Sequence, residues 1–253
     1  MTWVCWFFAL WVAWVTAVVQ AADEDPAALR TLAEQGDADA QNMLGWLYRT
    51  GNGLPQDYEE AAKWFRTAAE RGHAGAQLNL GWMYNKGEGM PRNHQTAIQW
   101  FRKSAEQGNT QAQFNLGLMY DKGEGVPQDY QEAVKWYRKA AEQGDTGAQN
   151  ILGLMYEGGE GVPQDYREAA RWYRLAAEQG ETGAQIFLGL MYENGDGVPQ
   201  DNLQALMWLN LAAAQGNINA IIGRDNLASR MTPAQIAQAQ EMARTWKPGK
   251  PKR

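Results

Sequence analysis

An internal period of 36 residues constrains the fold of this chain more than any other feature. Columns of Gly, Trp, Tyr and Pro keep that step without an insertion or deletion between residues 33 and 212. A fixed period of roughly 20 to 50 residues is typical of solenoids, in which each repeat buries its apolar face against its neighbours. We therefore predict five 36-residue repeats over residues 33–212. The glycine column consists of Gly36, Gly72, Gly108, Gly144, Gly180 and Gly216.

The first half of each repeat is predicted to be a helix. Asp37 is placed to cap it, because a short acidic side chain accepts hydrogen bonds from the first free backbone N–H groups. Apolar residues then follow at offsets of i, i+4, i+7 and i+8, which form one helical stripe. Gly45 beside this stripe predicts a close approach by a second helix, and Gly51 and Gly53 end the first one. The stripe comprises Ala40, Leu44, Leu47 and Tyr48.

The second half of each repeat is predicted to be another helix. Pro55 fixes a turn, and Asp57 caps the helix, with Glu60 placed to complete a box-like pair. The apolar stripe has Trp64 at its edge. The predicted fold is therefore all-α, a right-handed α-solenoid (superhelix) of helix-turn-helix repeats, by analogy with other helix-pair repeats. The second stripe comprises Ala61, Phe65 and Ala68.

The sequence on either side of the repeats predicts caps and a tail. Residues 22–36 are expected to hold an N-terminal capping helix that starts at Asp25-Pro26. Residues 213–246 are expected to hold a C-terminal capping helix pair, whose second helix starts at Thr232-Pro233 with Gln235 three residues after its cap. Residues 247–253 form a basic, proline-broken tail that is predicted to be disordered.

The amino-terminal segment is typical of an export signal. Residues 3–19 form an apolar run of 17 residues without a charge, followed by the small residues Ala21 and Ala22. We predict a signal peptide over residues 1–21, and hence a periplasmic or secreted protein of the bacterial cell envelope. The alternative is an uncleaved anchor, because 17 residues lie at the short edge of what spans a bilayer. Contact with a membrane is expected only in that second case.

The consensus of the repeats resembles the Sel-one-like repeat (SLR), a relative of the tetratricopeptide repeat. The resemblance covers all five repeats and recurs in register. It implies a bacterial exported adaptor that holds other proteins and is not an enzyme. In the third repeat the matching residues are Gly108, Ala112, Gln113, Leu116, Gly117, Tyr120, Gly123, Gly125, Val126, Pro127, Gln128, Asp129, Tyr130, Ala133, Trp136, Tyr137 and Ala140.

The composition offers little for catalysis. The chain has two His, two Ser and one Cys, and Cys5 lies in the export segment. His73 occupies a helix-cap position, His94 a position held elsewhere by Tyr, and Ser104 a position held elsewhere by Ala, so all three are interpreted as structural. We predict no catalytic residue, no metal and no cofactor. A net charge of -6 gives no attraction to phosphate, so no nucleic-acid partner is expected either.

A partner-binding groove is predicted by analogy with tetratricopeptide repeats. Its lining would lie three residues before, one after and four after the glycine of each first helix. The alternative is that Trp46, Trp82 and the leucines of this set are buried between repeats, and the Trp column of the second helices is interpreted as structural. The predicted lining consists of Asn42, Trp46, Arg49, Leu78, Trp82, Asn85, Phe114, Leu118, Asp121, Asn150, Leu154, Glu157, Ile186, Leu190 and Glu193.

These patterns lead to one functional hypothesis and two alternatives. The first is a non-catalytic, exported scaffold whose concave groove binds a protein segment or an envelope polymer, with aromatic residues as anchors. Some cysteine-rich members of the resembled family are active on β-lactams, so a β-lactam or cell-wall hydrolase-like activity is one alternative, although residues 22–253 contain no cysteine. The other is a membrane-tethered envelope assembly factor.

Overall fold

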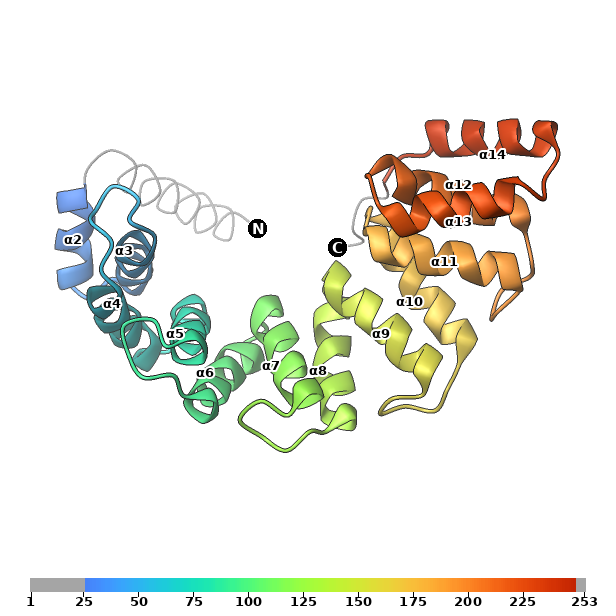
Figure 1. The fold of residues 1–253 in the computed structure, drawn as a ribbon. Coiled ribbons are helices and arrows are strands. Elements are labelled where there is room, and N and C mark those ends of the chain that lie inside the picture. Colours follow the sequence, from blue (N-terminus) through green and yellow to red (C-terminus); the bar gives the residue numbers. More distant parts are fainter. Residues whose placement is uncertain (1–25, 249–253) are drawn as a thin grey trace, which may run out of the picture. The chain divides into compact units, whose positions relative to one another are not determined.

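The computed structural model describes residues 26–248, in which every regular element is an α-helix (Figure 1). The prediction of an all-α chain of helix-turn-helix repeats is thereby confirmed. The predicted signal segment and the last five residues of the predicted tail lie outside this range. The helices are α2 (Pro26–Glu34), α3 (Ala38–Thr50), α4 (Tyr58–Glu70), α5 (Ala74–Lys86), α6 (His94–Glu106), α7 (Thr110–Lys122), α8 (Tyr130–Glu142), α9 (Thr146–Gly158), α10 (Tyr166–Glu178), α11 (Thr182–Asn194), α12 (Asn202–Ala214), α13 (Ile218–Ala228) and α14 (Pro233–Thr245).

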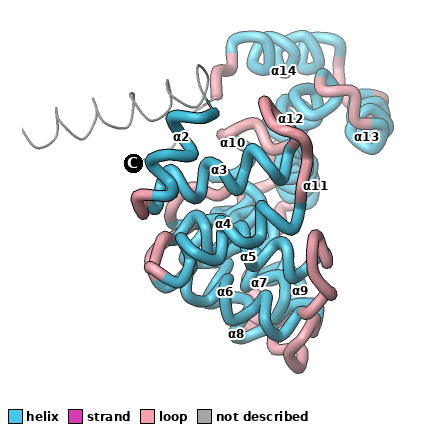
Figure 2. Tube along the Cα trace, turned by 90° about the vertical axis from the view of Figure 1, so that its left-hand side faces the viewer, coloured by secondary structure: helices cyan, strands magenta, loops and turns pink. Residues whose placement is uncertain are grey.

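The chain divides into two compact units after Ala112, and each is described by itself. Unit one holds α2 to α6, and unit two extends from Gln113 in α7 through α14. Within each unit a first helix packs on the second helix of its own repeat, as α5 does on α6 and α9 on α10. Each second helix also packs on the first helix of the following repeat, as α4 does on α5 and α10 on α11. Figure 2 shows this alternation of helices and loops.

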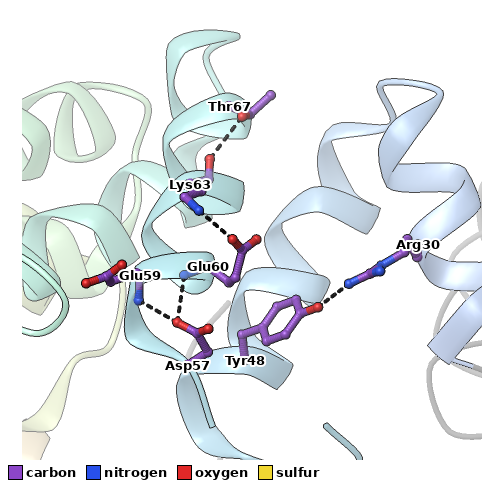
Figure 3. Close-up of polar contacts among 7 residues, drawn as sticks. All are labelled: Arg30, Tyr48, Asp57, Glu59, Glu60, Lys63 and Thr67. Carbon is purple, nitrogen blue, oxygen red and sulfur yellow. Dashed lines mark hydrogen bonds and ion pairs between the residues drawn. The ribbon is translucent and has the colours of Figure 1, made fainter. Parts of the chain in front are cut away.

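The helix ends are formed as the sequence predicts. Asp37 Oδ1 accepts a hydrogen bond from the backbone N–H of Ala40 at 2.8 Å, and Asp57 Oδ1 accepts those of Glu59 and Glu60 at 3.0 Å (Figure 3). Each such cap is worth about 1 kcal/mol. One detail differs, because the Glu60 carboxylate does not complete a box with Asp57 but accepts a hydrogen bond from Lys63 on the next turn.

The glycine of each first helix marks a close contact, as predicted. A Cβ atom on Gly45 would lie 2.8 Å from the ring of Phe65 on α4, and one on Gly81 would lie 2.7 Å from the ring of Phe101 on α6. In unit two a Cβ on Gly153 would overlap the ring of Tyr173 on α10. In the first four repeats the two helices therefore pack with an aromatic ring directly against the backbone of the first helix, and in the fifth Leu209 takes the place of the ring.

The second glycine of the later loops has a role that could not be foreseen from the sequence, whereas a Cβ on Gly53 of the first loop would meet no atom within 4 Å. A Cβ on Gly89 would lie 2.5 Å from the carbonyl oxygen of Tyr58, and one on Gly197 would overlap that of Tyr166. Both glycines also have a positive φ, which other residues rarely adopt. They therefore allow the loop of one repeat to pack against the start of the preceding repeat's second helix.

A buried glutamine joins successive helices in each unit. Gln77 Nε2 donates to the carbonyl oxygen of Ala69 at 3.1 Å, and its Oε1 accepts from Gln107 Nε2 at 2.7 Å. Gln149 and Gln185 make the same pair of contacts in unit two. Because buried polar atoms need partners, this column fixes the register between repeats.

The tryptophan column of the second helices belongs mainly to the core. Trp136, Trp172 and Trp208 are buried, whereas Trp64 and Trp100 are half-buried. Lys139 Nζ lies 4.1 Å from the ring centroid of Trp136, so a cation covers the outer edge of that column. This agrees with the structural role predicted for the column.

The C-terminal helix pair also begins as predicted. Thr232 and Gln235 form a reciprocal capping box at the start of α14, with Pro233 at the first position. Trp246, just after α14, packs edge-on against Trp208 at a centroid distance of 5.8 Å and an interplanar angle of 71°. This contact joins the end of the last helix to the tryptophan column of α12.

Candidate functional site: the first-helix surface

The predicted lining residues all lie on the first helices of the repeats. We call this set of residues the first-helix surface, and treat it separately in the two units. In unit one it consists of Asn42, Trp46, Arg49, Leu78, Trp82 and Asn85. In unit two it consists of Phe114, Leu118, Asp121, Asn150, Leu154, Glu157, Ile186, Leu190 and Glu193.

The residues that directly follow the helix glycine present apolar side chains to solvent. Trp46 is 41% exposed, Leu154 is 40% exposed and Leu190 is 39% exposed. For these three the alternative of burial between repeats does not hold. Large exposed apolar side chains on rigid helices can bury surface against a partner.

Trp82 occupies the same position but is more enclosed. It is half-buried, and it packs edge-on against Phe101 with the ring centroids 5.7 Å apart and the planes at 79°. Lys86 Nζ lies 5.3 Å from its ring centroid. Trp82 therefore divides its surface between the core of unit one and the solvent.

The residues three before the glycine lie closer to the core. Leu78 is only 7% exposed, which leaves little of it for a partner. Phe114 packs against Tyr137 at a centroid distance of 5.7 Å. Asn42 Oδ1 accepts a hydrogen bond from Asn79 of the next repeat at 3.0 Å. These predicted lining residues thus mainly hold neighbouring helices together.

The residues four after the glycine are polar, and each has a fixed partner. In unit one Arg49 Nε forms an ion pair with Glu88 Oε2 at 2.8 Å, and Asn85 Oδ1 accepts from His94 Nδ1 at 2.6 Å. In unit two Glu193 forms an ion pair with Arg230.

Two buried tyrosines hold carboxylates of the same column in unit two. The Tyr137 hydroxyl donates to Asp121 Oδ2 at 3.3 Å, and the Tyr173 hydroxyl donates to Glu157 Oε2 at 2.7 Å. Burial, together with the adjacent carboxylate, raises the pKa of both tyrosines far above its ordinary value. Both phenols therefore stay protonated and orient the carboxylates at neutral pH.

The histidines and the buried serine have structural partners. His73 Nδ1 accepts from the backbone N–H of Ala76 at 2.9 Å and so caps α5, which leaves the proton on Nε2, 2.8 Å from Asp39 Oδ1. Ser104 Oγ donates to the carbonyl oxygen of Ala74 at 2.7 Å. Across residues 26–248, no three side chains of His, Cys, Asp or Glu gather as metal ligands would.

A cavity on the second helices was not anticipated from the sequence. It lies beside α10 in unit two and is lined by Arg167, Arg171, Arg174 and Glu178, with Gly197 and Val198 of the next loop. Arg171 pairs with Glu168, and Arg174 donates to the Tyr192 hydroxyl at 2.7 Å. The spacing of i, i+4 and i+7 along α10 was the available sequence signal.

Stacked helix pairs with an ordered side-chain column on every first helix define an α-solenoid of the helical-repeat class. The Sel1 repeat matches residues 38–73, 74–109, 110–145, 146–181 and 182–217. The chain therefore belongs to the Sel1 repeat family, whose members are commonly non-catalytic scaffolds for protein–protein interaction. None of the helices between residues 26 and 248 is long and apolar enough to cross a bilayer.

Solved structures include several similar proteins. A Sel1 repeat protein from Oxalobacter formigenes is 36% identical, with a TM-score of 0.78, and the match covers 92% of this chain and 98% of that one. A protective antigen of uropathogenic Escherichia coli with an SLR fold is 29% identical, with a TM-score of 0.46, and the match covers 86% of this chain but only 62% of that one. A Sel1 repeat protein from Klebsiella pneumoniae is 24% identical, with a TM-score of 0.48 and coverage of 79% and 98%. No curated protein matches the chain.

Proposed function

We propose that this chain is a non-catalytic, exported scaffold that binds a protein segment on its first-helix surface. The observation that carries the proposal is the exposure of Trp46, Leu154 and Leu190, each on a rigid helix and each one residue after a helix glycine. Exposed apolar side chains cost solubility, and repeated ones are typical of binding surfaces. The interaction role common in the family supports the same conclusion.

The mechanism would be the addition of many small contacts along rigid helices. Each exposed side chain of the column buries a modest apolar area, at roughly 25 cal/mol per Å². The scaffold is already ordered, so binding does not pay for folding the surface. A partner that contacts several repeats would therefore gain affinity by repetition, and no catalytic group is needed.

Photo-cross-linking tests this proposal with a matched control. A photo-reactive amino acid replaces Leu154 or Trp46 on first helices, or Tyr166 or Tyr58 on second helices, and all four are exposed large side chains. In cells of the native host, we expect adducts with one protein from the first-helix positions only. Equal adducts from both sets would refute the assignment, and adducts with a glycan would identify an envelope polymer instead of a protein segment.

Export is part of the same proposal and has its own test. It is supported by the uncharged apolar run at residues 3–19 and the small residues after it. Mass spectrometry of the protein purified from the envelope is expected to show a chain that starts at Ala22. A chain that retains residues 1–21 in the membrane fraction would favour the tethered alternative.

A further inference from the structure

We infer that the first-helix surface of unit two binds a cationic segment in which Lys or Arg residues lie beside apolar ones. This inference rests on the proposed function and adds the chemistry of the partner. It follows from a comparison of the two units at equivalent positions of the repeat.

In unit one the charge four residues after the helix glycine is neutralised by another residue of the same unit. Arg49, four residues after its helix glycine, forms an ion pair with Glu88, which lies 39 residues later in the loop of the next repeat. The side chains are only 22% and 21% exposed, so the pair is partly shielded from water. A cation of one repeat thus compensates the loop carboxylate of the next.

In unit two, two of the three equivalent positions carry acids on both sides, and at the third Glu193 is paired with Arg230. The residues equivalent to Arg49 and Glu88 are Asp121 and Glu160, and again Glu157 and Asp196. Among the described residues none of these four carboxylates forms an ion pair. Because like charges at such sites repel one another, a bound cation would relieve the repulsion.

Two of these carboxylates are held in place by tyrosines. Tyr137 and Tyr173 donate to Asp121 and Glu157, whereas the equivalent positions of unit one hold Phe65 and Phe101. The tyrosines therefore occur in the repeats of Asp121 and Glu157, whereas the repeat of Glu193 has Leu209 at this position. A carboxylate oriented in advance loses less conformational entropy when it binds a cation.

Apolar side chains lie beside the acids on the same helices. Leu154 precedes Glu157 by three residues, which places the two on one helix face. Leu190 stands in the same way before Glu193, but that carboxylate is already paired with Arg230. Both leucines are exposed. A partner must therefore offer apolar groups to the leucines and cations to the carboxylates, which is the charge complementarity that selects one kind of segment.

The repeat spacing sets the pattern of that segment. Successive first helices are expected to lie about 10 Å apart. An extended chain advances about 3.3 Å per residue, so a cation about every third residue would meet one carboxylate pair per repeat. Such a segment would be recognised by unit two and not by the neutralised surface of unit one.

Peptide binding tests this inference directly. The probe is a fluorescent twelve-residue peptide with Lys at every third position and Leu between, and the comparison peptide has Glu in place of Lys. We expect the Lys peptide to bind the full chain at least tenfold more tightly, with an affinity that falls as salt rises. Equal binding of both peptides, or no binding of the Lys peptide, would overturn the inference.

Charge-neutral variants locate the site. The double variant Glu157→Gln with Glu160→Gln is expected to weaken binding of the Lys peptide about tenfold. The control, Glu142→Gln with Glu178→Gln, removes the same charge from second helices and should change binding less than twofold. Equal loss in both would mean that only the net charge matters. The Glu157→Gln, Glu160→Gln variant could bind the Lys peptide as tightly as the wild type, while Leu154→Asn abolishes cross-linking of the protein partner from the other first-helix positions. In that case the proposed function would stand, and the inference of a cationic partner would be overturned.

Discussion

Gly153 of α9 lies directly against the ring of Tyr173 of α10, so closely that a Cβ atom would overlap the nearest ring carbon. The ring is fully buried, and side chains in a close-packed interior have little room to move aside. In this repeat the distance between the two helices is thus set by one glycine and one aromatic residue.

Gly153→Ala is therefore expected to destabilise the fold although alanine favours helices. Overpacking of this kind costs about 1–3 kcal/mol, more than the gain in helix propensity of about 1 kcal/mol. The control is Gly158→Ala on the same helix, where the nearest atom is the flexible Glu160 side chain at 3.6 Å. Urea unfolding should show loss for the first variant and a small gain for the second. A gain for both would contradict the close contact.

The buried tyrosines predict a loss of stability at alkaline pH. Their pKa in the folded state is raised above the ordinary value of 10.0. The protonated phenols therefore stabilise the fold fully below pH 10, and this contribution is lost as the pH rises above it. Each tyrosine should make the free energy of unfolding fall by about 1.4 kcal/mol more for every pH unit above 10.

The free energy of unfolding between pH 9 and pH 11 checks this expectation. The variant Tyr137→Phe with Tyr173→Phe is compared with the wild type, since Phe fills the same position at Phe65 and Phe101. We expect a flatter decline in the variant. Parallel curves would show that the tyrosines are not responsible.

The glutamine column predicts one stabilising and one destabilising change. Gln41 Oε1 is buried without a hydrogen-bond partner among the described residues, because Arg71 stands where later repeats have Gln107 or Gln179. Arg71→Gln should supply the donor and stabilise the fold by about 1 kcal/mol. Gln179→Ala should leave Gln149 Oε1 unpaired and cost about 1–3 kcal/mol. Thermal unfolding measures both changes: the Tm should rise for Arg71→Gln and fall for Gln179→Ala. Shifts of the same sign in the two variants would contradict this account.

His73 provides a test of the cap on α5. Loss of its Nδ1 acceptor in His73→Ala should cost about 1 kcal/mol, whereas His73→Asn keeps an acceptor and should cost little. Chemical unfolding of both variants measures the difference. If His73→Asn were as unstable as His73→Ala, the contact with Asp39 and not the cap would be the stabilising one.

Much of the fold could be predicted because its causes are local. The Asp37 and Asp57 caps, the helix ends at Gly51 and the approach at Gly45 all follow from residues a few positions apart. The role of Gly89 could not be predicted in this way, because its neighbour Tyr58 lies in the preceding repeat. The second hydrogen bond of Gln77 also depends on a residue that only the packing brings near.

The sequence predicts which helices carry the candidate site, but it does not predict which of the side chains on them are exposed. The period places Leu78 and Trp46 on the same kind of helix, yet Leu78 is buried and Trp46 exposed. The difference arises because side chains three before the glycine contact the next first helix, as Asn42 contacts Asn79. The contrast between Arg49 with Glu88 and the acids of unit two became visible only when the ion pair was located.

The central claim, that the exposed column on the first helices binds a protein partner, is tested most directly by affinity. The dissociation constant of the cross-linked partner is measured by calorimetry for the wild type and two double variants. Leu154→Ser with Leu190→Ser should weaken binding at least tenfold, and Tyr58→Ser with Tyr166→Ser, equally exposed on second helices, should weaken it less than twofold. Loss of affinity only in the second variant, or equal loss in both with helix content unchanged, would contradict the account.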